Sequence, residues 1–175
     1  RKDRPMNPNL ILIGMAGCGK STIGVVAAKL LGYDFVDSDL VLQKQEGLLL
    51  REIISGFGVD YFKDAEARAL CSLEIDGTVI ATGGSAVYGE RAMKRLRENG
   101  VCVWLHLPFD EIEKRVGDAA ARGIVMESGK TLRDVYDERE PLYRRYADVR
   151  VDCSDDVARN AEIVVDRFLQ SCKNK

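Results

Sequence analysis

The sequence predicts an α/β fold, a three-layer α/β/α arrangement in which helices cover both faces of a five-stranded parallel sheet. Three observations carry this prediction. Apolar runs of strand length alternate with segments whose apolar residues recur at helical spacing. The run 101–107, VCVWLHL, is almost entirely apolar, as expected of a central strand buried on both faces. The glycine-rich stretch 14–22 joins the first predicted strand to the first predicted helix.

The strands are predicted from short apolar runs that follow turns or helix ends. The first, NLILI, is long enough for one buried strand, and the second carries Asp37 and Asp39 at its end. The turn signal Asp76-Gly77 precedes the third. The five predicted strands are 9–13, 35–39, 78–81, 101–107 and 148–152.

Segments with helical spacing fill the intervals between the strands. Gly32, Gly47 and Gly100 mark the ends of three of them, because glycine is favoured just after a helix. Gly56 and Gly58 break the stretch after residue 50 into a short helix, a turn and a longer helix. The predicted helices are 21–31, 40–45, a short one within 50–62, then 61–74, 89–99, 109–116, 131–146 and 156–172.

Composition indicates one globular domain, residues 9–175, after a polar tail or linker at 1–8. A chain of 175 residues with 46% hydrophobic and 31% charged residues can bury a sizeable core. The net charge of −2 gives no general attraction for nucleic acid or anionic membranes, and no apolar run has the length of a membrane span. Five scattered cysteines form no C-x-x-C pair. We expect a monomer in the cytoplasm that binds neither nucleic acid nor membrane.

Residues 14–22, GMAGCGKST, match the phosphate-binding loop pattern G-x-x-x-x-G-K-[ST]. The motif lies between a strand and a helix, which is the context that it requires. Its glycines let backbone N–H groups point at phosphate oxygens, and the helix N-terminus adds partial positive charge. Lys20 would reach the β- and γ-phosphates of ATP, and the Ser21 hydroxyl would ligate Mg²⁺. The alternative is a glycine-rich turn that binds nothing.

Other polar residues follow the predicted strands and can meet at the same edge of the sheet. If Asp37 and Asp39 lie in an extended segment, they share a face, where one carboxylate could orient the metal and the other accept a proton. Gly83 and Gly84 offer backbone N–H groups to a ligand. The aperiodic stretch 117–130 is expected to be a lid. Trp104 and His106 are expected to pack in the core.

These motifs together resemble those of the shikimate kinases, which have a P-loop kinase fold with a short lid. The resemblance runs from about residue 9 to residue 152. It rests on GMAGCGKST, FVDSD, FKDAE, ATGGSAV, an arginine in the lid and REPLYRR. It implies ATP-dependent phosphorylation of the 3-hydroxyl of shikimate, a step of aromatic amino acid biosynthesis, with Mg²⁺ as cofactor.

The resemblance also implies roles for the matching residues. ATP would be bound by the loop and two arginines, namely Gly17, Cys18, Gly19, Lys20, Ser21, Thr22, Arg115 and Arg122. Shikimate would be bound by Asp39, Lys63, Gly83, Gly84 and Arg139. Mg²⁺ would be held through Ser21 and Asp37. Lys20, Asp39 and Arg122 would be catalytic, with Asp39 as the base and Arg122 in the lid.

Three departures from the family pattern lie on the acceptor and lid side. Lys63 stands where the family has an arginine, so the charge stays but the planar fork is lost. Ser85 replaces the third glycine of a triple glycine, and the lid reads Arg122-Gly123-Ile124-Val125 instead of R-P-L-L. We expect Lys63 and Arg139 to bind the acceptor's carboxylate, with Glu66 holding the Lys63 ammonium group.

Two other functions stay open at this point. The first is a kinase of the same fold that phosphorylates a different small hydroxy-acid, which the three departures would suit. The second is a nucleotide-binding module without turnover. It is disfavoured by the intact candidate residues Lys20, Ser21, Asp37, Asp39 and Arg122. A nucleoside monophosphate kinase is disfavoured because the acceptor region is short and has few arginines.

Overall fold

The computed structural model describes residues 7–117 and 124–174. Its five strands form one parallel sheet in the order β2-β3-β1-β4-β5, which confirms the predicted fold class. The strands are β1 (Asn9–Ile13), β2 (Asp34–Asp37), β3 (Thr78–Ala81), β4 (Gly100–His106) and β5 (Val149–Asp152). Every residue of β1 and β3 is buried, as expected of strands with helices on both sides.

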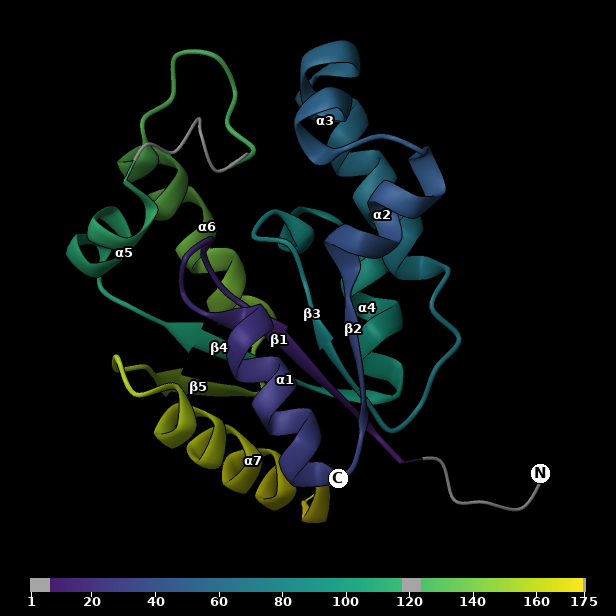
Figure 1. Ribbon diagram of the computed structural model, residues 1–175, viewed down its shortest axis with the longest axis vertical. Helices are drawn as coiled ribbons and strands as arrows, with labels where there is room; N and C mark the ends of the chain where they lie inside the picture. The colour runs from purple at the N-terminus through teal and green to yellow at the C-terminus, as the bar shows by residue number, and fades with distance from the viewer. Residues whose placement is uncertain (1–6, 118–123, 175) are drawn as a thin grey trace.

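Helices cover both faces of the sheet (Figure 1). On one face α1 packs against α7, and α3, α4 and α6 lie on the other. The helices are α1 (Lys20–Leu31), α2 (Ser38–Glu46), α3 (Leu50–Cys71), α4 (Glu90–Glu98), α5 (Phe109–Val116), α6 (Leu132–Tyr146) and α7 (Val157–Lys173), with a 3₁₀ turn η1 (Ala86–Tyr88). No helix among the described residues is both long and apolar enough to cross a bilayer.

The core has two parts. The larger cluster surrounds the sheet and includes all of β1 apart from Asn9. The smaller one lies between α2, α3 and the segment after residue 123, and its buried members are Leu42, Ile53, Phe62, Ala65, Ala69 and Val125. The α2–α3 unit therefore has an apolar core of its own beside the main one.

Several element boundaries differ from those expected. β2 ends at Asp37, whose side chain accepts a hydrogen bond from the Asp39 backbone N–H, so a helix begins where an extended segment was expected. Gly100 is the first residue of β4 and does not cap α4. The break in α3 is confirmed at Gly58, where φ is 87°, but the second part ends at Cys71.

Candidate active site

The P-loop has backbone angles that only glycine adopts readily. Gly14, Gly17 and Gly19 have φ of 147°, 81° and 98°. A Cβ atom on Gly14 would also lie 2.6 Å from the Leu105 carbonyl oxygen at the end of β4. Glycine at position 14 therefore lets the loop pass close to the end of β4. Helix α1 begins directly after the loop, so its N-terminus faces the loop.

Lys20 is buried beneath this loop. Its Nζ donates to the carbonyl oxygens of Gly14 at 2.7 Å and Met15 at 2.9 Å. Cys18 is fully buried, with its Sγ 3.8 Å from the same Nζ. The ammonium group is thus held within the loop whose backbone N–H groups would bind phosphate.

Ser21 and Asp37 come together at the N-terminus of α1. The Ser21 hydroxyl donates to Asp37 Oδ2 at 2.8 Å, and Asp37 Oδ1 accepts from the Asp39 N–H at 2.9 Å. The expectation that Asp37 and Asp39 share a face of an extended segment is wrong, because α2 starts at Ser38. The helical turn instead sends Asp39 away from Ser21 toward the Gly83-Gly84 turn.

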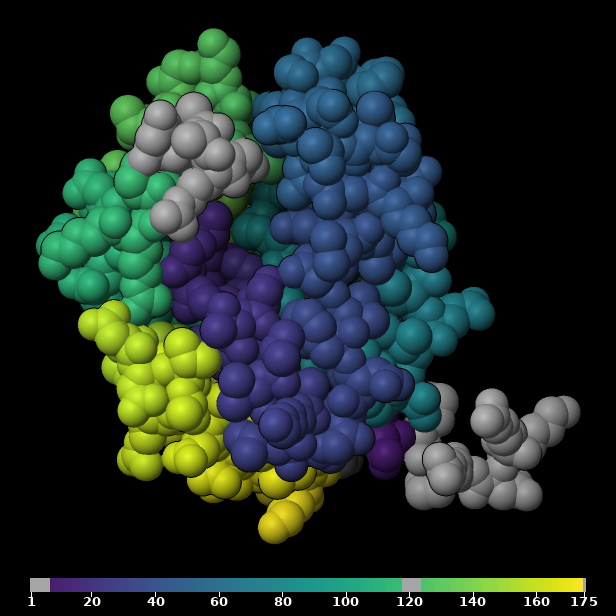
Figure 2. Space-filling model, viewed as in Figure 1, coloured from purple at the N-terminus to yellow at the C-terminus, as the bar shows by residue number. Residues whose placement is uncertain are grey.

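A cleft lies next to the P-loop, between the α2–α3 unit and the segment that precedes α6. Figure 2 shows the purple P-loop atoms at the floor of a groove beside the blue surface of α2 and α3. Its lining combines polar and apolar side chains with the glycine turn after β3. The lining residues are Ala16, Asp39, Leu50, Phe62, Glu66, Gly83, Gly84, Ser85, Ile124, Val125 and Arg139.

Gly83 and Gly84 allow three charged side chains to approach one another. A Cβ atom on Gly83 would overlap Glu66 Oε1 and lie 2.8 Å from Asp39 Oδ1. A Cβ atom on Gly84 would lie 2.8 Å from Arg139 Nη1. The Gly83 N–H donates to Ser38 Oγ at 3.2 Å inside the protein, and its expected contact with a ligand stays a prediction.

Two carboxyl groups in the cleft have raised pKa values. Burial, with the nearby charge of Asp37, raises the pKa of Asp39 to about 6, and Lys20 opposes the shift. Burial also raises the pKa of Glu66 to about 7, against a hydrogen bond from Ser85 Oγ to Oε2. The other oxygen, Oε1, has no hydrogen-bond partner within the described part of the chain.

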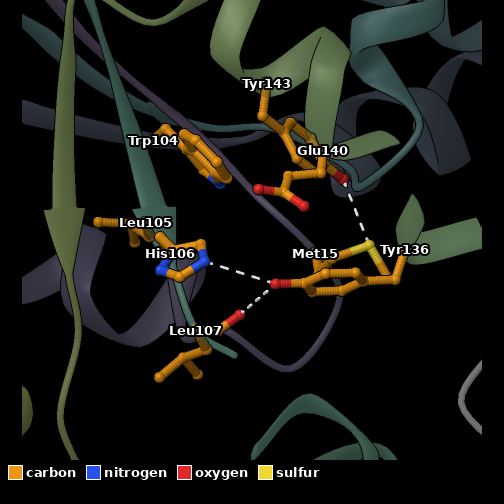
Figure 3. A pocket seen from close by; sticks show the side chains of 8 residues that line it. All are labelled: Met15, Trp104, Leu105, His106, Leu107, Tyr136, Glu140 and Tyr143. Carbon is orange, nitrogen blue, oxygen red and sulfur yellow. Dashed lines mark hydrogen bonds between the residues drawn. The ribbon is translucent and has the colours of Figure 1, made fainter. Parts of the chain in front are cut away.

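Arg139 is held in place by α6, on which two tyrosines lie one turn to either side of it. Tyr136 donates to the Leu107 carbonyl oxygen at 2.9 Å, and Tyr143 donates to the Gly84 carbonyl oxygen at 2.6 Å. Figure 3 shows both rings around a small cavity behind Met15. Arg139 itself is only 2% exposed, and its Nη2 donates to the Val125 carbonyl oxygen at 2.7 Å.

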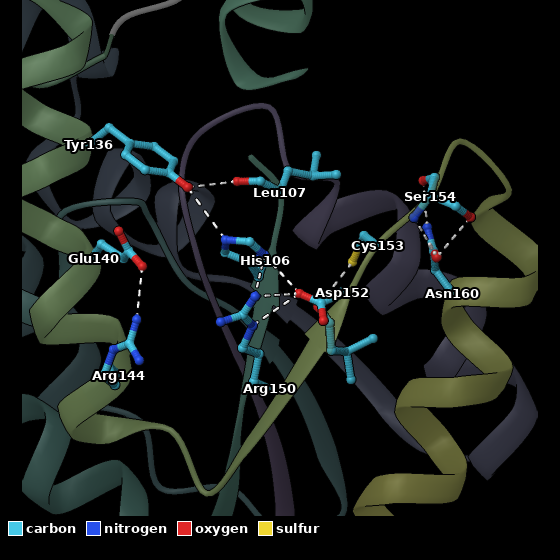
Figure 4. Close-up of polar contacts among 11 residues, drawn as sticks. His106, Leu107, Tyr136, Glu140, Arg144, Arg150, Asp152, Cys153, Ser154 and Asn160 are labelled. Atoms are coloured by element: carbon cyan, nitrogen blue, oxygen red, sulfur yellow. Dashed lines mark hydrogen bonds and ion pairs between the residues drawn. The ribbon is translucent and has the colours of Figure 1, made fainter. Parts of the chain in front are cut away.

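A polar cluster at the ends of β4 and β5 supports α6 from the other side (Figure 4). His106 Nδ1 lies 2.8 Å from Asp152 Oδ1 and 3.1 Å from Arg150 Nη2, and its Nε2 lies 3.4 Å from the Tyr136 hydroxyl. Trp104 is buried as expected, whereas His106 is only partly buried and combines these polar contacts with edge-on packing of its ring against Trp104.

Lys63 does not interact with Glu66 as expected. Its Nζ pairs with Glu127 Oε1 at 3.2 Å and lies 4.2 Å from the centre of the Tyr88 ring. Positions 63 and 66 are neighbours on the surface of α3, but Glu66 is buried and bonded to Ser85, whereas Lys63 is half-buried and reaches Glu127. The spacing of three residues was therefore a poor guide to this pair.

The remaining predicted nucleotide ligands are only partly placed. Arg115 contacts the P-loop, donating from Nη1 to the Gly17 carbonyl oxygen at 3.5 Å, and it pairs with Asp155 at 2.8 Å. Ser21 and Thr22 are exposed at the start of α1. Arg122 lies outside the described residues, as does the part of the expected lid from 118 to 123. The roles of these residues stay predictions.

Sequence reasoning gave Glu66 a role only as the partner of Lys63 and missed Tyr143, although a signal for a buried polar site was present in both helices. Glu66 lies in the apolar stripe of α3, and Tyr143 lies on the buried stripe of α6 with Arg139. A charged residue within a buried stripe needs a polar partner, so it marks a polar site inside the fold.

Comparisons with known proteins agree with the motifs. A family model described as shikimate kinase matches residues 16–173. A shikimate kinase of Pseudomonas fluorescens (strain Pf0-1) is 37% identical over 166 residues, which are 93% of this chain and 96% of the relative.

Two solved shikimate kinases are each 30% identical. That of Acinetobacter baumannii, in complex with shikimate, gives a TM-score of 0.85 and covers 94% of either chain. That of Aquifex aeolicus gives 0.78, covering 94% of this chain and 96% of its own. Because these matches span nearly the whole sequence, the chain belongs to the shikimate kinase family of ATP-dependent enzymes.

Proposed function

We propose that this chain transfers the γ-phosphoryl group of ATP to the 3-hydroxyl of shikimate, acting with Mg²⁺ as a monomer in the cytoplasm. The observation that carries the proposal is the position of Gly84. A Cβ atom there would lie 2.8 Å from Arg139 Nη1 and 3.4 Å from the Ala16 backbone nitrogen of the P-loop. A cation suited to a carboxylate and a loop suited to phosphates thus meet at one residue. The five free cysteines are typical of a reducing compartment.

The P-loop would hold the donor. Phosphate oxygens would replace the Gly14 and Met15 carbonyl oxygens as partners of the Lys20 ammonium group. The oxygens of Ser21 and Asp37 fit Mg²⁺, which in nucleotide sites takes one or two protein oxygens together with substrate phosphates. The metal would draw charge from the phosphates during transfer.

Asp39 would act as the base toward the acceptor. A pKa of about 6 leaves it ionised at neutral pH while making it a better proton acceptor than an exposed aspartate. As the acceptor hydroxyl oxygen bonds to the γ-phosphorus, its proton passes to the Asp39 carboxylate and the bond to the ADP oxygen breaks. Lys63 and Arg139 would bind the acceptor's carboxylate and so orient the hydroxyl.

A second candidate is a kinase of the same fold that acts on another small hydroxy-acid. Ser85 favours it, because its buried hydroxyl occupies the cleft wall where the family has a glycine. Acceptors that differ from shikimate at the hydroxyl nearest this wall would be the ones to test.

The test is an ADP-release assay with ATP, Mg²⁺ and a panel of hydroxy-acids that includes shikimate. We expect shikimate to give the highest kcat/KM. Asp39→Asn should lower kcat by about 10²-fold or more while leaving ATP affinity nearly unchanged. The matched control is Asp34→Asn, an exposed aspartate at the start of β2, the strand that precedes α2, and this variant should keep normal turnover.

Two results would count against the proposal. Turnover of another hydroxy-acid in place of shikimate would support the second candidate. An Asp39→Asn protein that loses ATP binding but turns over normally at saturation would assign Asp39 to the metal.

A further inference from the structure

Both cations expected to bind the acceptor's carboxylate are already held by one short segment. Glu127 Oε1 lies 3.2 Å from Lys63 Nζ, and the Val125 carbonyl oxygen accepts from Arg139 Nη2 at 2.7 Å. Ile124 and Val125 also line the cleft. The segment 124–127 therefore supplies a carboxylate and a carbonyl oxygen to the pair of side chains that an acceptor would use.

The ion pair between Lys63 and Glu127 joins residues 64 positions apart in sequence. It therefore connects α3 to the segment before α6, unlike an i, i+3 pair on the surface of one helix. The Lys63 ammonium group also lies 4.2 Å from the centre of the Tyr88 ring, so the ring covers one side of the ammonium group. Hydrogen bonds from Lys130 and Lys63 hold the pKa of Glu127 below its usual range. Glu127 is thus an anion throughout the neutral range.

We infer that Glu127 is a specificity-determining residue, an internal carboxylate that competes with the acceptor's carboxylate for Lys63. The inference rests on the proposed function of Lys63 as an acceptor ligand. A single ammonium group with one side against a ring has limited room for two carboxylates, unlike the forked guanidinium of an arginine. Binding of an acidic acceptor would therefore displace Glu127 from Lys63.

Glu127 has a second partner that makes this displacement inexpensive. Its Oε2 lies 3.0 Å from Lys130 Nζ, and Lys130 pairs in turn with Glu138 at 2.6 Å. When Lys63 turns to the acceptor, Glu127 keeps an ion pair with Lys130 and is not left alone. An acidic acceptor replaces the Glu127 carboxylate at Lys63 with its own carboxylate. A neutral acceptor has no carboxylate to offer, so it would leave the ion pair between Lys63 and Glu127 in place. Glu127 would then weaken the binding of acidic acceptors at this position and leave the binding of neutral acceptors unchanged.

The test is the steady-state kinetics of Glu127→Gln, with shikimate and its methyl ester as acceptors. Removing the competing charge should lower KM for shikimate by about twofold to fivefold, the range for a partly exposed ion pair. KM for ATP should not change. The methyl ester has the same hydroxyls but no charge, so its KM should be the same for wild type and variant.

The matched control is Glu138→Gln. Glu138 also anchors Lys130 and acts on Lys63 only through its more distant charge, since its ion pair and hydrogen bond go to Lys130 and Tyr88 in the described structure. This variant loosens the segment without removing the carboxylate bound to Lys63, so it should change KM for shikimate less than Glu127→Gln does. An equal fall in KM in both variants, an equal fall for the ester, or a rise in Glu127→Gln would overturn the inference. If the wild-type protein does not turn over shikimate at all, that result would instead overturn the proposed function.

Discussion

Glu66 is an ionisable residue at a position where a charge is costly. It is 2% exposed, Asp39 Oδ1 lies near it on the same side of Gly83, and its Oε1 has no partner in the described structure. The Ser85 hydroxyl offsets part of this cost by donating to Oε2. Since two neighbouring carboxyl groups with raised pKa values influence each other, their protons are lost in steps that belong to the pair.

The raised pKa of Glu66 predicts how stability depends on pH. Its folded-state pKa of about 7 exceeds its ordinary value of 4.5, so the fold prefers the protonated form. The resulting destabilisation is absent below about pH 4.5 and complete above about pH 7, where it is on the order of 3 kcal/mol. Glu66→Gln should therefore gain stability over wild type as the pH rises from 5 to 8, as measured by chemical denaturation.

Glu74→Gln is the matched control, because Glu74 is exposed just after the same helix. Its stability relative to wild type should not vary over this pH range. If the stability difference between Glu66→Gln and wild type were the same at pH 5 and pH 8, Glu66 would not be the buried acid that the structure indicates.

At the scale of elements, α3 and α6 each place a charged residue within a buried stripe. Phe62, Ala65 and Ala69 flank Glu66 on α3, and Val135 and Tyr143 share the buried face of α6 with Arg139. Helical periodicity predicted both helices. It could not predict that Glu66 would turn to Ser85 and Lys63 to Glu127, because those contacts depend on how loops far away in sequence return to the cleft.

The position of Lys63 on α3 predicts the effect of restoring the family's arginine. Lys63→Arg would offer the acceptor's carboxylate a planar fork with two parallel hydrogen bonds. KM for shikimate should fall by an amount equivalent to about 1 kcal/mol, the scale of one net hydrogen bond, while KM for ATP stays constant.

The matched control for this exchange is Lys44→Arg in the exposed last turn of α2, which should leave both KM values as they are. A higher KM for shikimate in Lys63→Arg would mean that the longer side chain clashes with an acceptor site shaped for a different acid. The same kinetic series therefore also tests the second candidate function.

At the scale of the whole molecule, the sequence predicted the sheet, its parallel character and the end of the sheet at which the site lies. Buried strands and the P-loop motif are local patterns, so they can be read without tertiary contacts. The η1 turn and the cleft wall at Ser85 depend on packing between elements, and local spacing did not predict them.

The two apolar clusters predict unequal local stability. Five buried residues of α2 and α3 pack with Val125 in the smaller cluster, whereas β1 and β4 lie in the much larger main cluster. Regions with fewer buried apolar contacts open more readily. In hydrogen exchange, the backbone amides of α2 and of α3 before Gly58 should therefore exchange faster than those of β1 and β4.

Shikimate should change this pattern at defined places, because an acceptor bound to Lys63 and Arg139 would tie α3 to α6. Amides at 59–66 and in the described part of the segment before α6 should exchange more slowly with shikimate, while those of α7 on the opposite face of the sheet should not change. The Asp34→Asn control should respond as wild type does. Equal slowing across the chain would indicate general stabilisation by the ligand, and slowing confined to α7 would place the acceptor on the wrong side of the sheet for the mechanism proposed.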